Sequence, residues 1–453
     1  MSVQSSPLAL GTENIQKLLI KYALPAIVAM TAASLYNMMD SIFIGHGVGP
    51  MAIAGLAITL PFMNIAAAAG SLVGVGASAL MSMKLGQKDH KSASLVLGNV
   101  ILLNVILGGI FTIISLIFLD PILLFFGASE ITLPYAREYM VVILLGNIVT
   151  HVYMGLNEVL RASGYPQKAM FATLFAVAIN GVLNYLFIFV MDMGIRGAAL
   201  GTICAQALSL AFIVLHFADT KNFIHFKRDI WVLKPHIVKG MLAIGLSPFL
   251  MNLCASLVVI LINNGLKTFG GDLAIGAYGI VNRIAFLFIM INMGFNQGMQ
   301  PIAGFNYGAR KLDRTMEVFK YTVICTTTVT TIGFITAQLF PRQLIMLFTT
   351  DEELIGLAVN GLRLILAAFP VVGFQMATSS FFQSIGMAKK AIFQSLTRQL
   401  IFLIPFLLIL PQIWGENGVW ISMPAADLAA FITAVFMIRY QVKKFKQEKM
   451  SIS

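Results

Sequence analysis

The sequence has little charge. Only 11% of its 453 residues are Asp, Glu, Lys or Arg, whereas 58% are hydrophobic and the mean hydropathy is +0.87. Soluble domains carry about 25% charged residues, so this composition excludes an ordinary soluble protein. Apolar runs recur along the whole chain, and each is about 20 residues long, enough to cross a bilayer core about 30 Å thick. The sequence therefore predicts a polytopic membrane protein of the all-α class.

Cysteine and histidine are also scarce. The three cysteines, Cys204, Cys254 and Cys325, lie in apolar segments, which favours small buried side chains over a disulfide framework. His151 is accompanied by no HExxH or two-His–carboxylate spacing, so no metal site is predicted there. The sequence indicates no cofactor. The first 23 residues lack the order of a cleaved signal peptide, and we expect a retained first span.

Hydropathy, together with the prolines and glycines that mark breaks between apolar runs, predicts twelve transmembrane helices. They cover about 18–45, 52–83, 93–119, 131–159, 169–190 and 195–217 in the first half, and about 240–266, 273–303, 317–340, 353–382, 391–412 and 417–439 in the second. The most polar internal stretch, Asp219–Lys239, separates the halves. We therefore expect an N-terminal six-helix bundle in 1–218, a cytoplasmic linker in 219–239, and a C-terminal six-helix bundle with a basic cytoplasmic tail in 240–453.

Lys and Arg are distributed unevenly between the two sides of the predicted membrane. Of the 30 basic residues, 24 fall before the first span, after an even-numbered span or in the C-terminal tail, and Arg398 is counted among those after span 10. The positive-inside rule then places both termini in the cytoplasm and predicts a multi-pass protein of the plasma (inner) membrane. The net charge of +11 reflects this topology and does not indicate nucleic-acid binding.

An internal repeat supports the division into halves. Three pairs of segments share an offset of 222 residues: 52–58 with 274–280, 84–92 with 306–314, and 160–171 with 382–393. Because six spans separate the copies, both halves keep the same orientation in the membrane. The sequence therefore predicts two six-helix bundles related by a pseudo-twofold axis along the membrane normal, with a ligand site near the midplane.

One carboxylate lies deep inside the first apolar segment. Asp40 falls in the stretch LPAIVAMTAASLYNMMDSIFIGHG at 24–47, and an acid in a spanning helix costs a few kcal/mol, so it normally faces a bundle interior or a watery cavity. Asp40 is therefore a candidate for binding an ion or a proton. The alternative is a structural acid paired with another buried polar group. Pro25 lacks a backbone N–H, which makes a bend near the start of this helix cheap.

Five segments resemble the multidrug and toxic compound extrusion (MATE) family. They are YNMMDSIFIG at 36–45, NEVLRASGYPQKAM at 157–170, NGVLNYLFIF at 180–189, GAALGT at 197–202 and QPIAGFNYGA at 300–309. The resemblance implies two bundles that form a V-shaped cavity and act by alternating access. It also implies export of small amphipathic, often cationic compounds, driven by entry of Na⁺ or H⁺. We expect such a transporter to be monomeric and not an enzyme.

The resemblance also implies a cation site in the first half. Its residues map onto Asp40, Asn180, Asn184 and Thr202, and the family's span-1 hinge proline maps onto Pro25. Independently, Asn180 and Asn184 are four residues apart and share one helical face. An all-oxygen, singly charged shell suits a monovalent cation, and the carboxylate alone suits a proton, so the coupling ion stays open with Na⁺ preferred. The alternative for the Asn pair is interhelical hydrogen bonding without a bound ion.

The sequence departs from the family pattern at two places. Many relatives carry Asp where this chain has Asn184, so a second titratable group is missing from the expected site. Other relatives carry acids in spans 7 and 10, near the positions of Ser256 and Phe374 in this chain. We therefore expect ion coupling to reside in the first half.

Other polar residues in the predicted spans have mainly structural interpretations. Glu158 and Arg161 are three apart on one helical face, which favours a local ion pair over a transport role. Arg283 in span 8 is predicted to pair with Asp427 in span 12, because a buried Arg needs an acidic partner. Further polar residues on spans 7 and 8 are candidates for lining the cavity: Asn263, Asn264, Asn282, Asn292, Gln297 and Gln300.

Three other functions compete with an exporter, and one of them, a channel, is disfavoured because the repeated bundle lacks a filter-like motif. Two remain. A lipid-linked oligosaccharide flippase of the same superfamily needs a strongly cationic cavity, whereas the basic residues inside the predicted spans are essentially Arg283 and Arg363. An intramembrane enzyme needs clustered catalytic side chains, and the sequence offers none beyond His151 and Glu158. Both alternatives are therefore disfavoured.

Overall fold

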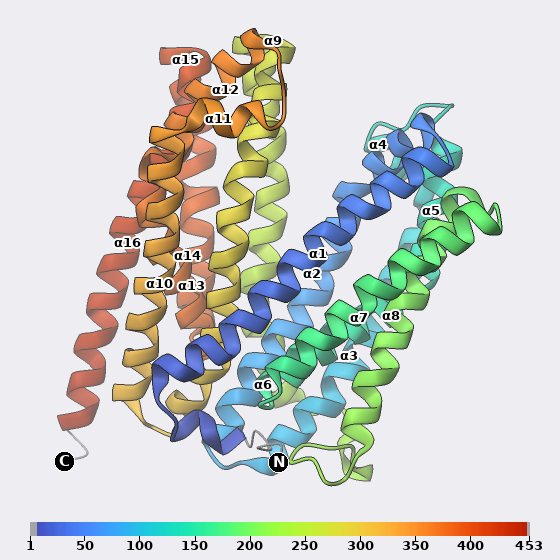
Figure 1. Cartoon of the computed structure of the whole chain (residues 1–453). Coiled ribbons are helices and arrows are strands. Elements are labelled where there is room, and N and C mark those ends of the chain that lie inside the picture. The colour runs from blue at the N-terminus through green and yellow to red at the C-terminus, as the bar shows by residue number, and fades with distance from the viewer. Residues whose placement is uncertain (1–6, 451–453) are drawn as a thin grey trace. The chain divides into compact units, whose positions relative to one another are not determined.

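The computed structural model describes residues 7–450, apart from the side chains of residues 7, 35–38, 50, 272 and 449. Within that range every regular element is a helix and no strand is present (Figure 1). The all-α class predicted from the hydropathy pattern is confirmed.

The first half of the chain forms eight α-helices after a short 3₁₀ helix, Pro7–Gly11. They are α1 (Ile15–Gly47), α2 (Pro50–Gly86), α3 (His90–Ile117), α4 (Leu119–Phe125), α5 (Leu133–Leu145), α6 (Asn147–Ala162), α7 (Pro166–Tyr185) and α8 (Gly194–Ala218). A π-helical turn, Leu186–Val190, extends α7. Proline at the start of α2 and α7 suits the first helical turn, because backbone N–H groups there have no acceptor within the helix.

The second half forms another eight. They are α9 (Pro235–Gly308), α10 (Leu312–Leu339), α11 (Pro341–Met346), α12 (Glu352–Ile365), α13 (Phe369–Ser384), α14 (Ala388–Leu396), α15 (Ile404–Trp414) and α16 (Glu416–Met450). A 3₁₀ turn, Leu366–Ala368, joins α12 to α13, and a π-helical segment, Thr397–Leu403, joins α14 to α15. Helix α9 is broken at Gly271, whose φ of 73° is readily adopted only by glycine.

These helices give eleven or twelve candidate membrane spans in the described part of the chain. Eleven are single helices or directly joined helices, and α5 with α6 makes a twelfth if a pair bent by 55° counts as one span. This number agrees with the twelve predicted spans. The predicted fourth span, 131–159, is the bent pair.

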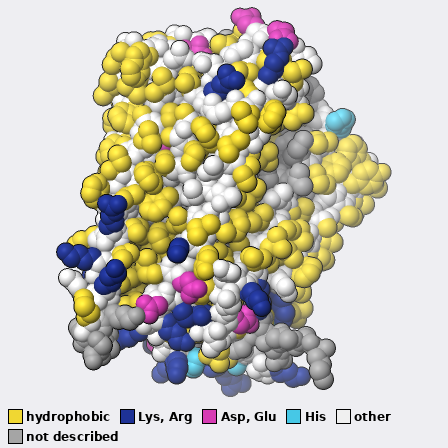
Figure 2. Space-filling view, turned by 60° about the vertical axis from the view of Figure 1, so that its left-hand side comes forward, with side chains coloured by type: hydrophobic (Ala, Val, Ile, Leu, Met, Phe, Trp, Pro, Cys, Tyr) yellow, Lys and Arg dark blue, Asp and Glu magenta, His cyan; other side chains and the backbone are white. Residues whose placement is uncertain are grey.

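The exposed surface has the polarity of a membrane protein. Helix α3 exposes Ile106, Ile110, Ile113, Ile114 and Ile117 at helical spacing, while it buries several polar side chains. A soluble helix shows the reverse pattern. On the face shown in Figure 2, hydrophobic side chains cover most of the middle, and Lys and Arg gather towards the lower end. The exposed apolar surface is therefore suited to contact with lipid chains.

The chain divides into two compact units. The first unit comprises the chain up to Glu13, Leu24–Phe249 and Gly304–Arg310, and the second comprises Asn14–Ala23, Leu250–Ala303 and the chain from Lys311 onward. Each unit has its own apolar core. The core of the first includes Ile44, Leu123 and Ile188, and that of the second includes Ile262, Leu362 and Trp420.

Helices α1 and α9 belong partly to each unit. Within helices the chain passes between units at three points, 23/24, 249/250 and 303/304. Pro25, Pro248 and Pro301 lie within two residues of these points. Each proline lacks the N–H that would bond to the carbonyl four residues earlier. Helix α1 is continuous through Pro25, and the predicted hinge there stays a prediction.

Local sequence features fix the helix ends and the close packing within the first unit. Asp89 caps α3, because its carboxylate accepts a 3.0 Å bond from the backbone N–H of Ser92. Burial acts to raise the pKa of Asp89, but the bonds from Ser92 and the nearby Lys84 outweigh it and hold that pKa below its usual value. Gly245 lets α9 approach α2 closely, since a Cβ there would lie 1.7 Å from the carbonyl oxygen of Leu72.

Candidate functional site

The structure places Asp40 inside the first unit, in contact with α7. Its side chain is 5% exposed, and its carboxylate accepts a short hydrogen bond from the side-chain amide of Asn184. A carboxylate buried in an apolar helix bundle needs such donors, because an unsolvated charge is costly. Asp40 therefore faces the interior of the unit.

The two asparagines of α7 extend this contact into a polar chain. Asn184 and Asn180 are 0% and 1% exposed, and the Asn184 amide nitrogen lies 3.1 Å from the Asn180 side-chain oxygen. The Asn180 amide nitrogen in turn lies 3.4 Å from the hydroxyl of Thr202 on α8. The four residues predicted from the sequence thus form one connected set of side chains from three helices.

The Asn180 amide fits its surroundings better when its oxygen and nitrogen are interchanged. When it is turned over, its nitrogen lies 3.1 Å from the Asp40 carboxylate and its oxygen lies 3.3 Å from the backbone nitrogen of Thr202. In this orientation the amide nitrogen donates to the carboxylate, and the amide oxygen accepts from the backbone N–H of Thr202. Asn180 therefore joins Asp40 to α8.

Gly201 makes room for this arrangement. A Cβ at this position of α8 would lie 2.2 Å from the side-chain oxygen of Asn184. The segment GAALGT at 197–202 therefore contributes a hydroxyl through Thr202 and the space for an amide through Gly201. Beyond Asn184, α7 changes to the π-helical turn Leu186–Val190, in which Ile188 is 2% exposed.

The predicted pair Arg283–Asp427 is wrong. Asp427 on α16 instead forms an ion pair with Arg398, which lies in the π-helical segment after α14. The side chain of Asp427 is 4% exposed, and that of Arg398 is 30% exposed. Arg398 was also wrongly assigned to a loop, whereas it lies inside the span Ala388–Trp414. Arg283 is exposed on α9.

The remaining polar candidates have various positions. Glu158 and Arg161 form the expected local ion pair, at 3.2 Å. Asn263 and Gln297 are half-buried on α9, and Asn282 is exposed. Near the two second-half positions where the resemblance implies acids in other members, the Ser256 hydroxyl donates to the backbone oxygen of Asn252, and Phe374 packs on Phe319 and Phe431. These two positions offer no carboxylate to a cation.

Sequence reasoning missed two features of the spans. One is Arg398, which falls inside the predicted span 391–412 and should not have been counted with the loop residues. The other is His151 on α6, which is 1% exposed and lies beside Gly108 and Phe111 of α3. From the sequence it is considered only as a metal ligand or as a catalytic partner of Glu158, and no group of three or more His, Cys, Asp or Glu suited to a metal occurs among the described residues.

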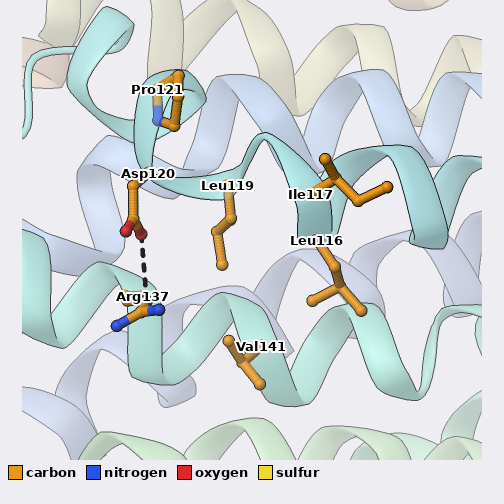
Figure 3. Close-up of a pocket in the computed structure, with 7 residues that line it drawn as sticks. All are labelled: Leu116, Ile117, Leu119, Asp120, Pro121, Arg137 and Val141. Carbon is orange, nitrogen blue, oxygen red and sulfur yellow. Dashed lines mark ion pairs between the residues drawn. The ribbon is translucent and has the colours of Figure 1, made fainter.

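A separate surface cavity of about 340 Å³ lies where α3, α4 and α5 meet. Asp120 and Arg137 face each other across it at 3.1 Å, and both are largely exposed (Figure 3). The other side chains around it are apolar: Leu116, Ile117, Leu119, Pro121 and Val141. Because the two charges neutralise each other in contact with solvent, this cavity lacks the buried oxygen ligands of the Asp40 set.

Comparison with known proteins gives consistent matches over nearly the whole chain. The MatE family model matches residues 25–186 and 244–409. The multidrug export protein MepA of Staphylococcus haemolyticus is 26% identical over 441 residues, which cover 97% of this chain and 96% of that protein. The MepA protein of Staphylococcus aureus is 27% identical over 432 residues, which cover 93% of each.

Solved structures share the same fold. A multidrug resistance MATE family transporter of the MOP superfamily, in an outward-facing conformation, superposes with a TM-score of 0.91 at 24% identity, over 99% of this chain and 100% of that one. A MATE crystal structure in a conformation described as bent gives 0.92 at 26% identity, over 98% of each chain. A MOP superfamily transporter from Pyrococcus furiosus gives 0.91 at 25% identity, over 98% of this chain and 100% of that one.

Proposed function

The chain belongs to the MatE family, and from this premise we propose that it is an antiporter that exports small amphipathic, often cationic compounds in exchange for Na⁺ or H⁺. The relatives that carry the name multidrug export protein support export of small molecules. The transport cycle is alternating access between the two sides of the membrane. The coupling ion binds at Asp40, Asn180, Asn184 and Thr202, and no other cofactor takes part.

The observation that carries this proposal is the connected set of oxygen-bearing side chains around one buried carboxylate. Asp40 supplies a single negative charge, which balances one monovalent cation. The oxygens of Asn180, Asn184 and Thr202 can replace part of the water shell of a hard cation. Because the set combines three helices of one unit, occupancy by an ion stabilises one packing of those helices relative to another.

The amides explain how the same site can be filled and emptied. With the carboxylate bare, amide N–H groups donate to it, as the Asn184–Asp40 bond does. With a cation present, the amides turn their oxygens towards it, because a side-chain amide carries both a donor and an acceptor. A proton on Asp40 removes the charge by another route. Na⁺ and H⁺ therefore compete for one carboxylate.

The test is drug efflux from proteoliposomes under separately imposed Na⁺ and proton gradients. We expect Asp40→Asn to abolish ion-driven efflux while protein yield is unchanged, because the variant keeps the shape of the side chain and loses its charge. Asp192→Asn is the matched control. Asp192 is exposed with a φ of 51°, which Asn also tolerates, so this variant should transport normally. Coupled efflux that persists in Asp40→Asn would remove Asp40 from the mechanism.

The four ligands predict which ion is used. If Na⁺ binds in the shell, Asn180→Ala and Thr202→Ala should weaken the Na⁺-driven efflux specifically, because each removes an oxygen that a proton on Asp40 does not need. If transport is indifferent to Na⁺ and follows only the pH gradient, the sodium shell is wrong.

The positive-inside rule places both termini in the cytoplasm of the cell, and protease access to a C-terminal tag from either side tests that orientation.

A further inference from the structure

His151 lies in a space that glycines of two neighbouring helices leave open. Its ring lies 3.3 Å from where a Cβ on Gly70 of α2 would be, and its Nδ1 lies 3.2 Å from where a Cβ on Gly108 of α3 would be. The ring is tilted against Phe111, with 6.4 Å between ring centroids. The imidazole is therefore held in one position by α2 and α3 while α6 carries it.

The hydrogen bond of the ring fixes which nitrogen can receive a proton. His151 Nε2 lies 3.0 Å from the backbone oxygen of Ala66. A carbonyl oxygen only accepts, so in the neutral ring Nε2 carries the hydrogen and Nδ1 is an acceptor. Nδ1 is buried and has no hydrogen-bond partner in the described part of the chain. Buried acceptors are nearly always satisfied, and an exception calls for an explanation.

A second buried acceptor without a partner lies on the adjacent helix. Asn104 of α3 is 1% exposed, and its amide nitrogen donates to the Val100 carbonyl at 2.9 Å, while its side-chain oxygen has no partner among the described residues. Asn104 packs against Gly155, since a Cβ there would lie 2.4 Å from its amide nitrogen. Gly155 is one helical turn from His151, and Asn104 is one turn from Gly108. The two acceptors therefore occupy successive turns of the same contact between α3 and α6.

We propose that His151 Nδ1 is a proton-binding site inside the first unit, and that the side-chain oxygen of Asn104 accepts the hydrogen bond of the bound proton, directly or through one water molecule. When Nδ1 binds a proton it becomes a hydrogen-bond donor, and the Asn104 oxygen becomes its acceptor. Neither buried atom is then left unsatisfied. His151 also supplies a titratable side chain, besides Asp40, in the interior of this unit. Its role in coupling rests on the proposed antiport, whereas proton binding itself does not.

Charged groups lie away from the ring on every helix that packs against α6. The contacts of the ring come from Ala66, Gly70, Gly108 and Phe111, which are uncharged. On α6 the ion pair Glu158–Arg161 lies about two turns further along. The other charged or titratable His, Lys, Arg and Glu side chains of the packed helices lie in the first or last two turns of α2, α3, α5, α7 and α8: Lys84, His90, Lys91, Arg137, Glu138, Lys168, Arg196 and His216.

Proton binding is tested directly by nitrogen NMR of the protein in lipid bilayers. The chain has six histidines, and ¹⁵N labelling of histidine with comparison to His151→Gln assigns the signal. We expect a neutral ring with hydrogen on Nε2 at pH 8, which gains a proton on Nδ1 between pH 8 and pH 5. In Asn104→Leu the midpoint should fall by roughly one pH unit, a tenfold loss of proton affinity. An Nδ1 that stays unprotonated down to pH 5, or a midpoint that ignores Asn104→Leu, overturns the proposal.

Efflux measurements on variants distinguish a failure of this proposal from a failure of the proposed antiport. His151→Gln keeps an amide N–H that can donate to Ala66, and we expect it to lose roughly tenfold in efflux driven by a pH gradient while Na⁺-driven efflux is unchanged. His225→Gln, in the loop after α8, is the matched control and should retain both. Equal loss of both activities in His151→Gln would make His151 a structural residue and overturn its role in coupling. If Asp40→Asn keeps coupled efflux, the proposed antiport fails, and the NMR result decides proton binding alone.

Discussion

Replacing Arg398 by methionine should destabilise the second unit markedly. Methionine keeps much of the length of the side chain and removes its charge, which leaves the Asp427 carboxylate without its partner. That carboxylate is 4% exposed, so solvent cannot replace the guanidinium. Breaking a buried ion pair from one side costs about 3–5 kcal/mol, because the remaining charge stays buried.

The exposures of the two partners predict an order of stability. Asp427→Asn leaves the charge on Arg398, whose side chain is 30% exposed and so less enclosed than that of Asp427, and its cost should be smaller. Arg398→Met combined with Asp427→Leu leaves no charge. Replacement of both partners by apolar residues is often neutral, or stabilising by about 1–4 kcal/mol. We therefore expect the double variant to be more stable than Asp427→Asn, and Asp427→Asn to be more stable than Arg398→Met.

Tryptophan fluorescence during heating of the purified protein in detergent measures this order. Trp420 is a suitable reporter, since it is 1% exposed in the core of the second unit and lies 6.3 Å from the ring of Tyr278. The apparent melting temperature of each variant is compared at one heating rate, because unfolding in detergent need not be reversible. An Arg398→Met variant as stable as the wild type, or less destabilised than Asp427→Asn, would refute the reasoning from burial.

Three further outcomes are expected. Gly201→Ala should displace the Asn184 amide and raise the Na⁺ concentration for half-maximal efflux by roughly tenfold, the equivalent of about 1.4 kcal/mol of ion binding, as measured in proteoliposomes. Glu158→Gln should destabilise the protein by about 2–3 kcal/mol, because Arg161 is largely buried, and the melting temperature should fall. Asp89→Ala should cost about 1 kcal/mol at pH 7 through loss of the α3 cap. Since the folded pKa of Asp89 is lowered, this difference should be present above about pH 4 and disappear on acidification.

Each of these outcomes has a control that the structure supplies. A Cβ added at Gly356 meets nothing within 4 Å, so Gly356→Ala should leave the ion dependence unchanged. If Gly201→Ala behaves in the same way, the Asn184 amide is not held as described. Asp89→Asn keeps a capping side chain and should be close to the wild type at pH 7. If the difference in melting temperature between Glu158→Gln and the wild type vanishes at high salt, the Glu158–Arg161 pair is solvent-exposed instead.

The number of spans and their order followed from hydropathy because long apolar runs separated by polar loops leave few alternatives. The bend at Gly146 between α5 and α6 did not. The segment around Gly146 is mostly apolar, and hydropathy carries no information about the direction of the chain inside the membrane. The bend depends on packing: a Cβ at Gly146 would lie 2.3 Å from the side chain of Ile203 on α8.

The composition of the candidate site could be predicted, but its geometry could not. The spacing of Asn180 and Asn184 and the resemblance of the surrounding segments selected the residues that the structure connects with Asp40. The orientation of the amides and the need for Gly201 depend on the distance between α7 and α8. That distance is set by packing, and no pattern of residues along one helix reveals it.

The errors in the second half and the omission of His151 have a common origin. Arg283 was paired with Asp427 because both fall in apolar runs, yet Arg398 occupies that position in space. The open Nδ1 of His151 likewise depends on the carbonyl of Ala66, 85 residues earlier in the chain. Pairing over such separations is determined by tertiary structure, and sequence spacing identifies partners reliably only within one helix.

The prolines at the unit boundaries have a mechanical consequence. A regular helix resists bending because its ladder of backbone bonds must stretch on one side. At Pro25, Pro248 and Pro301 one backbone hydrogen bond is missing because proline has no N–H. These prolines lie where α1 and α9 pass from one unit to the other. Bending of α1 and α9 is therefore easiest at these three prolines and at the break of α9 at Gly271. Alanine at all three positions would restore the missing backbone hydrogen bonds and stiffen both helices.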